Sequence, residues 1–175
     1  MNIIIAGCGK VGRALAEQLS KEKHDITVID LKPESIQLLT NAADVRGVVG
    51  NGASYDIQMD AGVDKADLMI AVTNADEVNL LCCLIAKKAG GCQTIARVRN
   101  PVYHHEIHHI KDELGLSMVI NPEWAAAMEM ARLLRFPSAI DIDTFANGRI
   151  ELLRFQLDDK NPLCGHKIRD LDTLS

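Results

Sequence analysis

Short apolar runs alternate with segments of helical periodicity along the first 136 residues, and this alternation constrains the fold most strongly. Six runs have the length of strands and lie at residues 2–6, 26–30, 45–50, 67–73, 94–99 and 117–120. Helical spacing of apolar residues follows each run, at residues 10–22, 33–42, 55–62, 76–91, 101–114 and 122–136. The runs are apolar throughout, which is typical of a parallel sheet covered on both faces. The pattern predicts an α/β fold, a Rossmann-type doubly wound six-stranded parallel sheet.

The remaining residues, 136–175, have a different pattern. Polar and apolar residues alternate on both sides of the segment Ala-Asn-Gly at 146–148, which predicts a β-hairpin. The pattern is then lost up to Ser175. We expect a first domain over residues 1–135 and, over residues 136–175, the truncated beginning of a small C-terminal α+β domain.

The first strand runs directly into glycines with the spacing G-x-G-x-x-G, and these glycines open the first helix. In such a βαβ unit the first glycine allows a tight turn, the second lets the backbone approach a pyrophosphate, and the third lets helix and strand pack closely. The phosphates then lie at the helix N-terminus. The predicted site therefore includes Gly7, Gly9, Lys10, Val11 and Gly12. The alternative is a glycine turn without a ligand.

An acidic residue ends the second strand, 18 residues beyond Gly12, because 30 − 12 = 18. At this position Asp30 can accept hydrogen bonds from ribose hydroxyl groups and repel a 2′-phosphate. NAD or an adenine nucleotide is therefore favoured over NADP, although the nearby Lys32 weakens that discrimination. A helix cap at the strand end is the alternative.

Two further loops follow strand ends, where the crevice of an open α/β sheet lies. Asn51 and Gly52 follow the third strand and are predicted to line an adenosine pocket. Thr73 and Asn74 follow the fourth strand and can reach phosphate or ribose oxygens. For this second loop, simple capping of the next helix is an equal alternative.

The fifth strand carries two basic residues. Because side chains alternate along a strand, Arg97 and Arg99 are expected on one face, where Arg97 can pair with phosphate. An exposed salt bridge is the alternative for each of them.

Four histidines gather in the segment His-His-Glu-Ile-His-His at 104–109. His104 with His108, and His105 with His109, are spaced as pairs that can bind a transition metal. No third ligand is near in the sequence, so we favour a solvated helix face and predict no metal site.

Composition excludes several classes of protein. The net charge of −5, the pI of about 5.6 and the lack of a basic run argue against nucleic-acid binding. No apolar stretch approaches the ~20 residues that span a bilayer, and the N-terminal residues do not resemble a signal peptide. The five cysteines form no C-x-x-C pair, so we expect reduced, buried thiols of a cytosolic protein.

Signatures of catalysis are missing as well. Neither Tyr55 nor Tyr103 begins the Tyr-x-x-x-Lys motif of short-chain dehydrogenases. The residues after 135 are too few for a substrate domain, and no pairing of a nucleophile with a base is visible. We therefore predict a receptor for a dinucleotide, not an enzyme.

Six segments resemble the regulatory subunits of Trk/Ktr potassium uptake systems, through the module called KTN or RCK. They are IIIAGCGKVGRALAEQL, DITVID, GNGAS, AGVDKADLMIAVTNADEVNLL, IARVRNPVY and INPEWAAAMEMARLL. The resemblance covers residues 1–135. Residues 136–175 are similar to the start of the family's C-terminal ligand-sensing domain.

The resemblance implies a nucleotide-sensing regulator. The family binds NAD(H), and also ATP or ADP, in the Rossmann crevice. It forms dimers and rings at the cytoplasmic face of the membrane, on a potassium-translocating subunit. The family's nucleotide-contact positions match the glycines together with Asp30, Asn51, Thr73, Asn74 and Arg97, whereas the histidine cluster is not part of the pattern.

The last predicted helix, residues 122–136, is apolar on more than one face, which suits a contact with a second subunit. A helix buried wholly within its own chain is the alternative there. For the protein as a whole, two alternatives stay open. One is a fragment of an NAD-dependent oxidoreductase, and the other is an RCK domain that regulates a different potassium channel or an antiporter.

Overall fold

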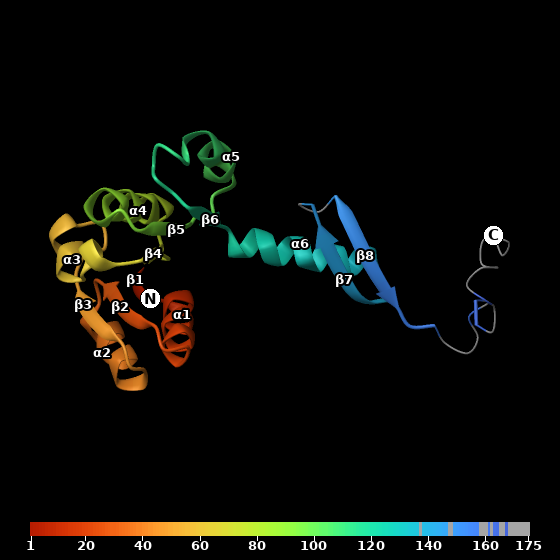
Figure 1. Ribbon diagram of the computed structural model, residues 1–175, viewed down its shortest axis with the longest axis horizontal. Coiled ribbons are helices and arrows are strands. Elements are labelled where there is room, and N and C mark those ends of the chain that lie inside the picture. The colour runs from red at the N-terminus through yellow and green to blue at the C-terminus, as the bar shows by residue number, and fades with distance from the viewer. Residues whose placement is uncertain (137, 147–148, 158–160, 162, 165–166, 168–175) are drawn as a thin grey trace. The chain divides into compact units, whose positions relative to one another are not determined.

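The computed structural model describes residues 1–136, 138–146, 149–157, 161, 163–164 and 167. The chain divides into two compact units, Met1–Trp124 and Ala125–Ser175. Figure 1 shows the helices and strands of both units.

The first unit is built on one parallel sheet. Its strands are β1 (Asn2–Ala6), β2 (Asp25–Asp30), β3 (Arg46–Val49), β4 (Leu68–Ala71), β5 (Gln93–Arg97) and β6 (Met118–Ile120). They lie in the order β3-β2-β1-β4-β5-β6, and every neighbouring pair is parallel. The chain therefore winds outward in both directions from β1 and β4, which confirms the predicted Rossmann-type sheet of six strands.

Helices cover both faces of this sheet (Figure 1). The helices of the first unit are α1 (Lys10–Lys21), α2 (Pro33–Ala42), α3 (Tyr55–Asp60), α4 (Asp76–Gly90) and α5 (Pro101–Ile110), with a 3₁₀ turn at Val63–Lys65. The helices α1 and α2 share one hydrophobic core with the sheet, whereas α3, α4 and α5 share another. Successive residues of β1 serve opposite cores, since Ile3 and Ile5 face one and Ile4 faces the other.

The strands β4 and β5 each end two residues before the predicted boundary, at Ala71 and Arg97. Side chains of α4 are the reason. The backbone N–H of Thr73 donates to the Asn79 side chain, and the N–H of Arg99 donates to the Asp76 carboxylate, so neither continues the sheet. The prediction that Arg99 shares a strand face with Arg97 was therefore wrong.

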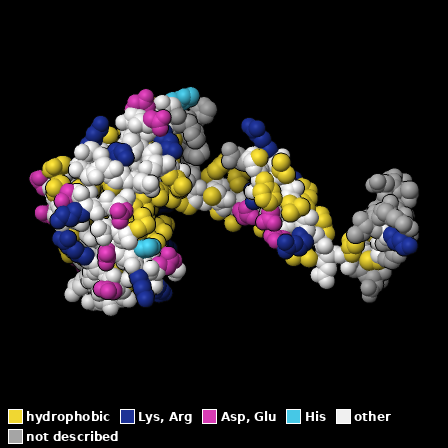
Figure 2. Space-filling model, in the orientation of Figure 1, with side chains coloured by type: hydrophobic (Ala, Val, Ile, Leu, Met, Phe, Trp, Pro, Cys, Tyr) yellow, Lys and Arg dark blue, Asp and Glu magenta, His cyan; other side chains and the backbone are white. Residues whose placement is uncertain are grey.

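The helix α6 (Pro122–Arg135) begins at the end of the first unit and continues into the second, and none of its residues is buried. In the second unit β7 (Ala139–Phe145) and β8 (Ile150–Phe155) form an antiparallel pair, which confirms the predicted hairpin. The hairpin residues 147–148 lie outside the described part of the chain. Figure 2 shows hydrophobic side chains gathered on the visible face of this unit. In the described part of the chain, no helix has both the length and the apolar character needed to cross a bilayer.

Candidate functional site

A cavity of about 390 Å³ opens at the carboxyl ends of β1, β2, β3 and β4. In an open α/β sheet this edge, at the point where the strand order reverses, is where ligands bind. Four loops line the cavity, through residues 7–9, 29–32 with Ser35, 50–52, and 72–75 with Val78.

Seven of the predicted site residues lie in this lining: Gly7, Gly9, Asp30, Asn51, Gly52, Thr73 and Asn74. The other four, Lys10, Val11, Gly12 and Arg97, do not line it. Lys10 is the exposed first residue of α1, and Gly12 is buried behind the turn. The structure thus brings together residues from four loops that are distant in the sequence, while the role of each toward a ligand stays a prediction.

The glycine turn has two different kinds of constraint. Gly7 has a φ of +106°, and a Cβ atom there would lie 2.9 Å from the backbone nitrogen of Thr73. A Cβ atom at Gly12 would lie 1.8 Å from the carbonyl oxygen of Gly7, so α1 packs directly against the turn. At Gly9, by contrast, a Cβ atom would meet nothing within 4 Å. Gly9 is therefore not required by packing, and it leaves the N-terminus of α1 open.

Asp30 holds the glycine turn in place. Its Oδ2 accepts a hydrogen bond from the backbone N–H of Cys8 at 2.6 Å, and its Oδ1 accepts one from the N–H of Lys32 at 2.8 Å. A carboxylate oxygen has a further lone pair, so Asp30 retains acceptor capacity toward a ribose. The residue therefore fixes the shape of the cavity and faces it at the same time.

The thiol of Cys8 forms part of the cavity wall. Its Sγ donates to the carbonyl oxygen of Ser35 at 3.3 Å. Burial raises the pKa of Cys8 above its usual value, and the negative charge of Asp30 raises it further. The thiol is therefore neutral near pH 7. The sequence pattern gave no signal for Cys8, because the G-x-G motif leaves this position unspecified.

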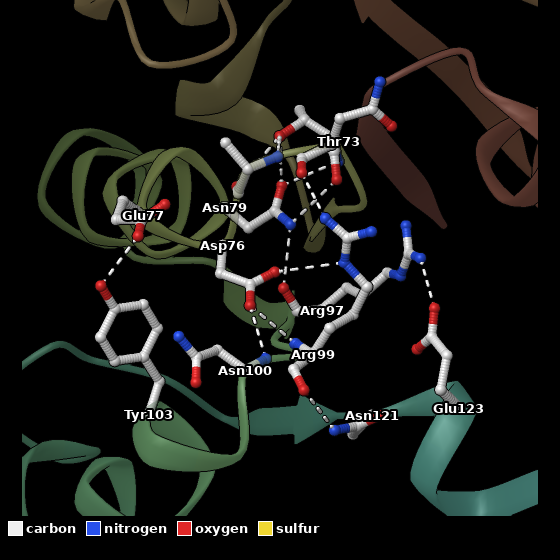
Figure 3. A network of polar contacts seen from close by, with 12 residues as sticks. Thr73, Asp76, Glu77, Asn79, Arg97, Arg99, Asn100, Tyr103, Asn121 and Glu123 are labelled. Atoms are coloured by element: carbon white, nitrogen blue, oxygen red, sulfur yellow. Dashed lines mark hydrogen bonds and ion pairs between the residues drawn. The ribbon is translucent and has the colours of Figure 1, made fainter.

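Asn79, on the first turns of α4, fastens the end of β4 to the end of β5 (Figure 3). Its Oδ1 accepts hydrogen bonds from the backbone N–H and the hydroxyl group of Thr73, both at 2.7 Å. Its Nδ2 donates to the carbonyl oxygen of Arg97 at 2.9 Å. Asn79 is fully buried, so the Thr73 loop is held by a side chain that does not itself reach the cavity.

Asp76 makes an equivalent attachment for the turn between β5 and α5. Its Oδ2 accepts from the backbone N–H groups of Arg99 and Asn100, both at 2.8 Å. Asp76 is the first residue of its own helix, α4, but its carboxylate caps the β5–α5 turn and is buried there.

Arg97 does not line the cavity, and it forms an ion pair with Glu123, with 2.7 Å between Nη2 and Oε1. The hydrogen bond from Arg97 lowers the pKa of Glu123 below its usual value. The structure thus shows a salt bridge, which was the alternative for Arg97, with the arginine side chain 11% exposed and the Glu123 side chain 55% exposed. A contact of Arg97 with phosphate remains a prediction. To make it, Arg97 would have to exchange Glu123 for the phosphate.

The described residues contain no group of three or more histidine, cysteine, aspartate or glutamate side chains able to hold an ion. The side chains of His104, His105 and His108 lie outside the described part.

Four of the five cysteines are buried, as expected, but Cys164 is exposed, so the prediction was wrong for that residue. Burial raises the pKa of Cys82 to about 12 and that of Cys83 further still.

Asn79 was missed in the sequence analysis, although its position in the sequence indicates a buried role. It lies on the same helical face as Cys82, Cys83 and Ala86, at spacings of three, four and seven residues. All four are buried, and a polar residue on an otherwise apolar face indicates a buried hydrogen-bonding role.

Comparison with known proteins shows the family of this chain. The family model described as the TrkA-N domain matches residues 3–122. The Trk system potassium uptake protein TrkA homolog of Archaeoglobus fulgidus is 39% identical over 171 residues, which cover 98% of this chain and 39% of that protein. This chain thus spans about two fifths of the length of that relative.

Solved structures share the fold. The TrkA-N domain of the inner membrane protein ybaL from Escherichia coli is 26% identical, with a TM-score of 0.67, covering 76% of this chain and 96% of that domain. The GsuK channel bound to NAD is 21% identical, with a TM-score of 0.58, covering 68% of this chain and 21% of the channel. That second likeness concerns the fold alone. The match over most of the first unit, together with the identity to the Archaeoglobus relative, places this chain in the TrkA-N domain family.

Proposed function

We propose that the chain binds an adenine nucleotide, either NAD(H) or ATP/ADP, and is the sensing part of a regulator of Trk-type potassium uptake. The observation that carries the proposal is the cavity at the carboxyl edge of the sheet, where the open N-terminus of α1 at Gly9 meets the Asp30 carboxylate. Free N–H groups at a helix N-terminus suit phosphate, and a carboxylate at the end of the second strand suits a ribose.

The proposed role is regulation, not catalysis. Relatives carry the name of the Trk potassium uptake system, and the GsuK channel has been solved with NAD bound. The described lining of the cavity combines Asp30, Lys32, Cys8 and amide or hydroxyl groups, without the histidine that most often serves as a general base.

A regulator of this kind would act by shifting a conformational equilibrium. A ligand shifts such an equilibrium only by its different affinities for the two states. NADH and ATP differ in length and in terminal charge, so they can favour different states. The loop 72–75 lines the cavity and is tied to the β5–α5 turn by Asn79 and Asp76, which gives the ligand a connection to the rest of the first unit.

The proposed partners are a membrane potassium-translocating subunit of the Trk/Ktr type and further copies of this chain, and nucleic acid is not among them. The proposed location is cytoplasmic, at the inner face of the cell membrane through that subunit. We further propose that residues 1–135 form the RCK N-terminal (KTN) domain and that residues 136–175 begin its C-terminal domain. Co-purification with a Trk-type membrane subunit, compared with a channel or antiporter, tests the choice of partner.

Calorimetric titration with NAD, NADH, NADP, ATP and ADP tests the central proposal. We expect saturable binding of at least one of these nucleotides and weaker binding of NADP than of NAD. Binding of none of them would contradict the proposal. Turnover of NADH with a candidate substrate would instead favour the alternative of an oxidoreductase fragment.

A further inference from the structure

The cavity covers only part of the crevice. A doubly wound sheet consists of two mononucleotide-binding halves, and a dinucleotide lies across both. The lining residues lie at the end of β2, in the loops after β1, β2, β3 and β4, and in the first turns of α2 and α4, and no described residue beyond Val78 contributes. The volume of about 390 Å³ is near the small end of the roughly 300–1,000 Å³ that is typical of ligand sites.

The side chain of Arg99 bridges the carboxyl ends of β4 and β5, in the second half (Figure 3). Its Nη2 donates to the carbonyl oxygen of Asn74, a residue that lines the cavity. Its Nε lies 3.6 Å from Oδ1 of the buried Asp76. The guanidinium therefore spans the edge of the sheet where the second nucleotide of a dinucleotide would lie.

The backbone of Arg99 is held as firmly as its side chain. Its N–H donates to Oδ2 of Asp76 at 2.8 Å, and its carbonyl oxygen accepts from Nδ2 of Asn121 at 3.0 Å. The ion pair of Arg97 with Glu123 lies at the same edge of the sheet, at the ends of β5 and β6. Arg99 is thus fixed at a defined position by residues from α4 and from the segment after β6.

We propose that Arg99 determines the specificity of the site by closing the second half of the crevice. The cavity that is left takes a mononucleotide-sized adenosine phosphate, and a dinucleotide must displace the arginine. The inference rests on the proposed nucleotide binding. A dinucleotide loses the contacts of Arg99 with Asn74 and Asp76 on binding, whereas ADP keeps them. Specificity is a difference between two affinities, and this contact lowers only one of them.

Titration of the same chain with ADP and with NADH, in wild type and in Arg99→Ala, tests the inference. We expect the Kd for NADH to fall by about threefold to tenfold in Arg99→Ala, since a charge-assisted hydrogen bond and a partly exposed ion pair no longer need to break. The Kd for ADP should change by less than about twofold, because the fork of Arg99 lies outside the ADP-sized cavity. A thermal unfolding curve of each variant shows that it is folded.

Two further variants sharpen the test. Arg99→Lys keeps the charge but loses the fork, so its Kd for NADH should lie between those of wild type and Arg99→Ala. Arg46→Ala is the matched control, because Nη2 of Arg46 also donates to a backbone carbonyl oxygen, that of Asp60 at 2.6 Å. Arg46 lies at the amino end of β3, whereas the cavity opens at the carboxyl ends of the strands. Its removal should therefore leave both affinities unchanged.

The outcomes separate the two proposals. Stronger NADH binding with unchanged ADP binding in Arg99→Ala supports the closing role of Arg99. Equal changes for both ligands, or weaker binding of both, would overturn it while leaving the proposed function intact, since Arg99 would then be a structural or phosphate-binding residue. Binding of neither ligand by the wild type would overturn the proposed function and this inference together.

Discussion

At the scale of single residues, substitutions at Gly9 and at Gly12 are expected to affect different properties, ligand binding at Gly9 and folding at Gly12. A side chain at Gly9 enters open space at the start of α1, whereas one at Gly12 would collide with the carbonyl oxygen of Gly7. We expect Gly9→Val to keep the melting temperature of the wild type and to lower nucleotide affinity at least tenfold, because the valine would occupy the place of the pyrophosphate.

Gly12→Ala is the contrasting variant, and it should lower the melting temperature. Thermal unfolding and calorimetry on both variants give the comparison. Unchanged nucleotide affinity in a folded Gly9→Val variant would remove the glycine turn from the binding site.

Asp30 supports the cavity as well as facing it. Asp30→Ala leaves the backbone N–H groups of Cys8 and Lys32 without their carboxylate acceptor. We expect the free energy of unfolding to fall by about 1–3 kcal/mol without any nucleotide present, since water can replace only part of these bonds. Urea denaturation measures the change.

Asp25→Ala is the matched control for that measurement, because Asp25 is an exposed carboxylate at the other end of the same strand. A loss of nucleotide binding in Asp30→Ala without a loss of stability would contradict the supporting role.

At the scale of elements, Asn79 joins β4, β5 and α4. Asn79→Leu keeps the number and branching of the side-chain heavy atoms but leaves the N–H of Thr73 and the carbonyl oxygen of Arg97 buried without a partner. We expect a loss of about 2–4 kcal/mol in the free energy of unfolding, because unpaired buried polar groups are costly. Urea denaturation tests this, with Asn41→Leu on the exposed surface of α2 as the control. Equal stability of the two variants would mean that the strand ends do not depend on Asn79.

The ion pair of Arg97 with Glu123 connects the end of β5 to the start of α6, and it predicts a pH effect. The hydrogen bond from Arg97 holds the pKa of Glu123 below its unfolded value, so the stabilisation is present above that value and is lost as the pH falls through the folded pKa. We expect Glu123→Gln to be less stable than wild type at pH 7, by under about 1 kcal/mol because Glu123 is exposed, and the difference to be smaller at pH 3.

Urea denaturation at the two pH values measures the effect of Glu123→Gln. In an Arg97→Met background the same substitution should have no pH-dependent effect, as a double-mutant cycle would show. A gap that persists in that background would assign the effect to another neighbour of Glu123.

The order and type of the elements could be predicted because each depends on local patterns. The isoleucines of β1 face two cores, so the run is apolar throughout, and the loops at Gly7, Asp30, Asn51 and Thr73 meet because parallel strands bring their carboxyl ends to one edge. The contacts of Arg99 could not be predicted. Its partners at Asn74 and Asp76 are more than twenty residues away, and whether they meet depends on how two loops fold against each other.

At the scale of the whole molecule, α6 presents large exposed apolar side chains, among them Trp124, Met130 and Leu134. We predict that the chain is at least a dimer through residues 122–136, since exposed apolar surface of this kind indicates a contact with another protein surface. Light scattering at micromolar concentration should give at least twice the chain mass of 19.2 kDa. A wild-type monomer would contradict the prediction.

Substitution on α6 tests where the chains meet. Leu134→Glu combined with Met130→Glu should give a monomer, because a buried charge at an apolar contact is costly. Leu38→Glu, on the exposed side of α2, is the control and should leave the mass unchanged.

The position of β1 at the centre of the sheet has a consequence for the chain while it is being made. One edge of β1 pairs with β2 at residues 25–29, but the other edge pairs with β4 at residues 68–71. Until residues 68–71 have emerged from the ribosome, this isoleucine-rich strand therefore has one edge unpaired, and such edges attract other strands. Chaperone protection or fast synthesis would matter most during the interval in which residues 31–71 emerge. The strand β1 thus has both of its neighbours only once β4 at residues 68–71 has emerged, well after β2 at residues 25–30.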